Sequence, residues 1–119
     1  MLAKKDAIAA RKRQFNLHRA LGLAYLRYGN LPEAERVLRP LLDHYQKIPG
    51  LGLVHQVSFL RDFACQRLLV GDEVEFAEVV KRALSIAVNA GLDHQTRRIC
   101  NTFGDTILQP IFEELPSNR

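Results

Sequence analysis

The segment HRALGLAYLRYGNLPEAERVL, residues 18–38, decides the fold of this chain. Apolar residues recur at helical spacing up to Leu26, and Gly29-Asn30 follows, a pair that tolerates the left-handed conformation in which helices end. Leu31-Pro32-Glu33 then places a proline in the first turn of a second helix, where its missing N–H is not needed. The segment therefore predicts two antiparallel helices joined by a tight turn.

The helical pattern continues on both sides of this hairpin. Pro40 lies inside the second expected helix and removes one backbone donor from it. No run of alternating apolar and polar residues is long enough for a strand. The sequence predicts an all-α fold of antiparallel hairpins with five to six helices in one domain, residues 1–119. The expected helices cover 3–28, 32–47, 53–69, 73–89 and 93–109, and a short tail covers 110–119.

Composition places the chain among ordinary globular proteins. It has 119 residues, of which 47% are hydrophobic and 25% charged, enough for one domain with a core. No apolar stretch is long enough to cross a membrane, and the mixed charged start is unlike a signal peptide. We therefore expect a cytoplasmic protein without a membrane partner. Cys65 and Cys100 stand alone in apolar surroundings, which predicts reduced thiols and no disulfide or zinc site.

The hairpin residues resemble the tetratricopeptide repeat (TPR) family. The pattern His18-x-x-Leu21-Gly22-x-x-Tyr25 precedes the turn, and Ala34 and Leu38 follow it. Small residues at Gly22 and Ala34 suit the closest crossing of two helices, and His18 stands where the family usually has tryptophan or another large residue. A second, looser pair begins about 42 residues later, with Phe63-Ala64 for Leu-Gly and Arg67 for the tyrosine. The phrase ALSIAVNAGL, 83–92, is similar to the longer repeats of MalT-type regulators.

The resemblance covers about residues 15–90 and implies a short superhelix whose first helices line a concave groove for a peptide or a partner helix. Arginines in this groove would bind carboxylates, which predicts an acidic or C-terminal peptide. Exposed leucines there would instead join two copies of the chain, so a homodimer is the alternative. The groove-facing positions carried over from the family are Asn16, Arg19, Leu23, Leu26, Arg27, Ser58, Arg61, Leu68, Leu69 and Arg98.

No constellation of catalytic residues is found. The four histidines are scattered without a partner at metal-ligand spacing, and His18 is expected in the core. We therefore expect no enzyme, no metal and no cofactor. The favoured function is a protein-interaction module or adaptor, and the alternative is a self-assembling fragment of a bacterial transcriptional regulator. Nucleic-acid binding through the basic stretch 4–13 is less favoured, because few aromatic residues accompany it.

Overall fold

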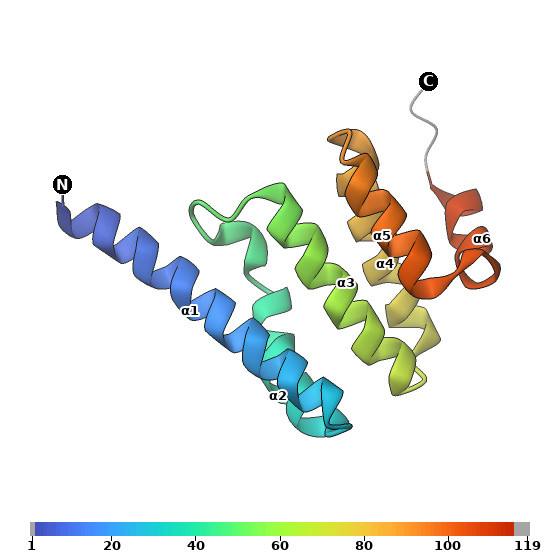
Figure 1. The fold of residues 1–119 in the computed structure, drawn as a ribbon, viewed down its shortest axis with the longest axis horizontal. Helices are drawn as coiled ribbons and strands as arrows, with labels where there is room; N and C mark the ends of the chain where they lie inside the picture. Colours follow the sequence, from blue (N-terminus) through green and yellow to red (C-terminus); the bar gives the residue numbers. More distant parts are fainter. Residues whose placement is uncertain (1, 116–119) are drawn as a thin grey trace. The chain divides into compact units, whose positions relative to one another are not determined.

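The computed structural model describes residues 2–115, with side chains from residue 6 onward, and over that range its regular secondary structure is all helical (Figure 1). The predicted all-α class with five to six helices is confirmed, and the described residues form no strand. The helices are α1 (Leu2–Arg27), α2 (Leu31–Leu42), the 3-10 turn η1 (Tyr45–Lys47), α3 (Leu53–Leu69), α4 (Glu73–Asn89), α5 (Asp93–Phe103) and α6 (Asp105–Glu114).

The chain divides into two compact units, Met1–Gly52 and Leu53–Arg119. We call them unit 1 and unit 2 and describe each by itself. The expectation of one TPR-like domain over 1–119 stays a prediction.

Unit 1 is the hairpin of α1 and α2, which run in opposite directions (Figure 1). Gly29 turns the chain with a φ of 76°, and the Asn30 side chain accepts a hydrogen bond from the N–H of Glu33 at 3.4 Å. A Cβ atom added to Gly22 would clash with the fully buried side chain of Leu38. The absence of a side chain at Gly22 therefore lets the two helices approach.

The second helix is shorter than the sequence predicts. It was expected over 32–47, but α2 ends at Leu42 and the chain continues as a turn into η1. Pro40 has no N–H, so the last turn loses a helical hydrogen bond. The N–H groups of Asp43 and His44 bond to carbonyls only three residues back, those of Pro40 and Leu41, both at 3.3 Å. The backbone thus tightens to 3-10 geometry after the proline.

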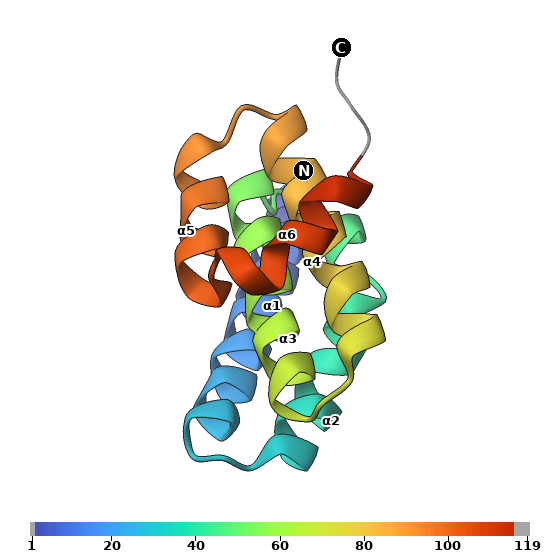
Figure 2. The same cartoon turned by 90° about the vertical axis from the view of Figure 1, so that its right-hand side faces the viewer.

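Unit 2 is built on a second hairpin, α3 with α4, and α5 packs on both of these helices. The last helix, α6, lies against α4 and α5 (Figure 2). The rings of Phe76 and Phe103 meet edge to face with centroids 5.0 Å apart, joining α4 to α5. The large apolar side chains of this unit that are fully buried are Val57, Phe59, Leu60, Phe63, Val79, Val80, Leu84, Ile99 and Leu108.

The prediction of one helix over 93–109, followed by a tail from Pro110, is wrong. Gly104 has a φ of 84° and ψ of 156°, a conformation that side chains rarely adopt, and it separates α5 from α6. Pro110 lies inside α6, where it leaves the carbonyl of Thr106 without a helical donor; Thr106 is exposed, so water can bond there. Residues 116–119 of the expected tail lie outside the described residues.

Among the described residues, no helix has both the length and the apolar character needed to cross a bilayer.

Candidate functional site

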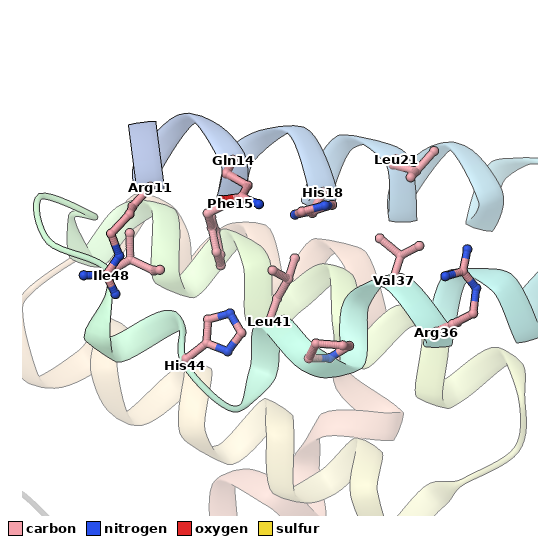
Figure 3. Close-up of a pocket in the computed structure, with 11 residues that line it drawn as sticks. Arg11, Gln14, Phe15, His18, Leu21, Arg36, Val37, Leu41, His44 and Ile48 are labelled. Carbon is pink, nitrogen blue, oxygen red and sulfur yellow. The ribbon is translucent and has the colours of Figure 1, made fainter. Parts of the chain in front are cut away.

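Unit 1 contains an open groove of about 500 Å³ between α1 and the segment formed by α2 and η1 (Figure 3). It is the candidate site, and we call it the α1–α2 groove. Its lining residues are Arg11, Gln14, Phe15, His18, Leu21, Arg36, Val37, Pro40, Leu41, His44 and Ile48.

The groove follows from the unequal lengths of the two helices. At about 1.5 Å per residue, the 26 residues of α1 span roughly twice the length of the 12 residues of α2. Beyond Leu42, the facing side of α1 is met by the turn and η1, where Tyr45 is buried. His18, expected in the core, is instead exposed and lines the groove. A large residue at this position, as in the resembled repeat, would occupy more of this space.

The groove has an apolar floor and a basic rim. Phe15, Leu41 and Ile48 are buried beneath it. The exposed side chains of Arg11, His18, Arg36 and His44 surround the floor, and Figure 3 shows Arg11 and Arg36 toward opposite ends of the groove. None of the described acidic side chains lines it. The groove can therefore receive apolar side chains at its floor and carboxylates at its rim.

The two arginines of the rim differ in their surroundings. Arg36 already donates to a carboxylate, since its Nε lies 2.8 Å from Oε2 of Glu33. This hydrogen bond and the charge of Glu33 raise the pKa of the Arg36 guanidinium. Part of its charge is thus balanced within α2. No acidic side chain shares the lining of the groove with Arg11, so Arg11 is the more open anchor for an incoming carboxylate.

Charge is divided unevenly between the two units. Residues 1–52 hold ten Lys and Arg against four Asp and Glu, a formal charge of +6, whereas residues 53–119 hold seven against nine, a charge of −2. Together these give the net charge of +4. The groove therefore lies in the strongly basic unit, whose field attracts acidic ligands.

A row of apolar side chains on α1 and the turn after it includes one residue of the groove lining. Leu17 is 68% exposed, Leu21 43% and Tyr28 89%. With Ala24 they follow the spacing of four, three and four residues that keeps side chains on one face of a helix. Leu21 belongs both to this row and to the groove lining. The apolar contact area available to a partner thus extends beyond the groove itself.

The predicted site residues of α1 lie elsewhere on the helix. Asn16 and Arg27 are exposed, whereas Arg19, Leu23 and Leu26 are half-buried. At 3.6 residues per turn, this set faces away from Leu17 and Leu21. Sequence reasoning therefore selected a different face of α1 from the one that borders the groove.

The predicted site residues of unit 2 are also of mixed exposure. Ser58 is buried, and its hydroxyl donates to Oε1 of Gln95 at 3.4 Å, so it joins α3 to α5 and is not open to a ligand. Arg61 and Leu68 are half-buried, and Leu69 and Arg98 are exposed. The expectation that these residues and those of α1 line one concave groove stays a prediction.

Arg67 has a structural role that the sequence alone did not indicate. Its buried guanidinium lies 3.2 Å from Glu75 and 3.5 Å from Asp72, and over the ring of Phe63 at 5.6 Å. Asp72 also caps α4 by accepting from the N–H of Glu75 at 3.1 Å. Arg67 therefore joins the end of α3 to the start of α4. In the sequence, the two acidic residues Asp72 and Glu75 after the turn are the feature that could have indicated a partner for Arg67.

The surroundings of the two cysteines disfavour the thiolate form. Burial raises the pKa of both the Cys65 and Cys100 thiols, and the nearby carboxylates of Asp62 and Asp105 raise it further. Both are free and half-buried. Among the described residues, no three His, Cys, Asp or Glu side chains gather so as to hold a metal ion.

Comparison of the chain with protein-family models, curated proteins and solved structures finds no match. The resemblance to TPR proteins therefore rests on the hairpin residues described above.

Proposed function

We propose that this protein is a protein-interaction module with TPR-like hairpins, and that unit 1 binds an acidic segment of a partner protein in the α1–α2 groove. The observation that carries the proposal is the composition of the groove, with its apolar floor, basic rim and absence of described acidic lining residues. The proposed activity is binding without catalysis.

The expected ligand is a helix or short peptide with apolar residues on one face and carboxylates beside them. Its apolar side chains would fill the groove above Phe15 and Leu41, and because these two side chains are already largely buried, this contact supplies only part of the affinity. Its carboxylates would pair with Arg11 at the rim. Because exposed ion pairs contribute only about 0.2–1 kcal/mol, they select the charge and orientation of the ligand more than they strengthen binding.

Three other proposals remain for comparison. One is the concave face predicted from the family, with Arg19 and Arg61 as carboxylate anchors. Another is nucleic-acid binding, which the formal charge of +6 on residues 1–52 favours. Self-association through Leu68 and Leu69, as in a regulator fragment, is the third arrangement drawn from the sequence.

The test is fluorescence anisotropy with a labelled synthetic helical peptide that has Leu and Phe on one face and Glu beside them. A second peptide, in which every Glu is replaced by Lys, serves as the control ligand. We expect binding of the acidic peptide only. Arg11→Glu should weaken it by about fivefold, the equivalent of roughly 1 kcal/mol. Arg13→Glu is the matched control, since it makes the same charge change two residues away and does not line the groove.

Equal losses from Arg11→Glu and Arg13→Glu would mean that general charge attraction, not the groove, holds the peptide. A larger loss from Arg19→Glu or Arg61→Glu would move the site to the predicted concave face. Binding of a single-stranded oligonucleotide in preference to the peptide, with a steep fall of affinity in salt, would favour nucleic acid.

A further inference from the structure

The helix α6 in unit 2 carries the chemistry that the groove in unit 1 requires of a ligand. One face of α6 presents Asp105, Gln109, Phe112 and Glu113, which border a shallow hollow of about 390 Å³. The opposite side, with Leu108 and Ile111, is buried in unit 2. The Phe112 side chain is 38% exposed. The free face of α6 is thus acidic at both ends and has an aromatic ring between them.

We infer that α6 of a second copy of this chain occupies the α1–α2 groove, so that copies associate head to tail. The inference rests on the proposed function and names the partner of the same site. In this arrangement the ring of Phe112 covers the floor formed by Phe15 and Leu41. The carboxylates of Asp105 and Glu113 lie near the rim arginines.

Dimensions and charge support this pairing. The ten residues of α6 span about 15 Å, and the lining of α1 from Arg11 to Leu21 covers a similar length. Asp105 and Glu113 are eight residues apart, about 12 Å, and Arg11 and Arg36 lie toward opposite ends of the groove (Figure 3). The units that would meet carry formal charges of +6 and −2. An α1-to-α1 pairing would instead bring like charges together.

The groove and α6 are different surfaces, so each copy offers both halves of the interface. Such an interface forms rings where the rotation closes and open chains where it does not. One face of a ten-residue helix buries far less than a standard protein interface, so association should be weak, with a dissociation constant on the order of 10 µM to 1 mM.

The experiment is analytical ultracentrifugation of the full chain from about 10 µM to 1 mM. The weight-average mass of the wild type should rise with concentration. Arg11→Glu and Glu113→Arg should each raise the dissociation constant about fivefold or more, because each places like charges across the interface. Ile107→Arg is the control for α6, because it also makes the helix more positive: Ile107 is 45% exposed but does not border the hollow, so its change should leave association unaltered. Arg13→Glu serves the same purpose for α1.

Two combinations make the test specific. An equal mixture of the Arg11→Glu and Glu113→Arg proteins should form mixed assemblies in which the two proteins alternate, since the groove of each is opposite in charge to α6 of the other, whereas each protein alone places like charges together. The double variant, Arg11→Glu with Glu113→Arg, should recover association within one protein, because the charges are exchanged and not removed. Far-UV circular dichroism shows that each variant keeps its helices.

A wild-type mass of one chain at every concentration would overturn the inference. So would association that weakens equally on Ile107→Arg and on Glu113→Arg, or that fails to return in the mixture and in the double variant. If only Leu68→Glu and Leu69→Glu abolished the rise of mass with concentration, self-association would lie on α3 instead. None of these outcomes decides the proposed function, because binding of the synthetic acidic peptide is also measured on the Glu113→Arg protein, which keeps the groove residues and should not self-associate.

Discussion

Adding a single methyl group at Gly22 tests the packing on which unit 1 depends. A Cβ atom at this position would overlap the side chain of Leu38, which is fully buried and has no solvent to move into. Overpacking a tight contact of this kind costs about 1–3 kcal/mol. The exchange of glycine for alanine inside a helix returns about 1 kcal/mol through helix propensity. We therefore expect Gly22→Ala to lower the free energy of unfolding of unit 1 by about 1 kcal/mol.

The sign of this effect should reverse when Leu38 is shortened. Leu38→Ala alone removes a buried side chain and should destabilise unit 1 by about 2–5 kcal/mol. In that background the new methyl at position 22 enters vacated space, so Gly22→Ala should stabilise by about 1 kcal/mol. Leu38→Val provides a milder second background.

The natural tyrosines allow unit 1 to be followed separately. All three, Tyr25, Tyr28 and Tyr45, lie within residues 1–52, and the chain has no tryptophan. Tyrosine fluorescence during urea unfolding therefore reports on unit 1, while far-UV circular dichroism reports on both units. Additive effects of Gly22→Ala and Leu38→Ala would refute the reasoning, because residues in direct contact should show a coupling energy. Stabilisation by Gly22→Ala in the wild type would likewise mean that the helices separate at little cost.

Three further predictions concern unit 2. Arg67→Met should destabilise it by about 2 kcal/mol in urea unfolding, less than for a fully buried pair, because Asp72 and Glu75 keep partial solvent contact; an unchanged midpoint would contradict the structural role. Gly104→Ala should lower the free energy of unfolding by about 1–3 kcal/mol, because alanine is strained at the positive φ of this position, and it should lower the thermal midpoint of the α5–α6 region. An unchanged free energy of unfolding would show that the backbone between the two helices adjusts to the new side chain. The raised thiol pKa values of Cys65 and Cys100 predict slower reaction with a disulfide reagent at pH 8 than in the urea-unfolded chain. Because the folded state disfavours the thiolates, stability should hold below about pH 8.5 and fall as the pH rises above it, and stability that increases there would exclude the assigned cause.

Local turn chemistry explains how far the fold could be predicted. Gly29-Asn30 and Gly71-Asp72 each combine a glycine at positive φ with a side chain that caps the next helix, through Asn30 in one turn and Asp72 in the other. These are short-range signals, and they place the ends of four helices within about two residues in most cases. The helical spacing of apolar residues continues across Gly104, so the sequence pattern does not indicate a helix end there. The pattern instead predicts a helix end at Pro110, although a helix can include a proline.

The binding surface was harder to predict because exposure is a tertiary property. The periodicity of α1 indicates which residues share a face, but the length of the facing helix decides which face is covered. His18 was expected in the core from its place in the repeat pattern, yet it is exposed beside the α2 residues Val37 and Leu41. Ser58 was expected to be exposed and is buried. Only the packing of α5 on α3 shows that its hydroxyl donates to Gln95.

One backbone feature connects the fold to the proposed binding. Pro40 weakens the last turn of α2, and the chain leaves the helix two residues later. The buried residues Phe15 and Leu41 form the floor of the groove, and the charged side chains that line it among the described residues are basic. An apolar floor alone would favour any hydrophobic segment, and a basic rim alone would favour any polyanion. The two together favour an amphipathic segment with carboxylates, the description that the free face of α6 meets.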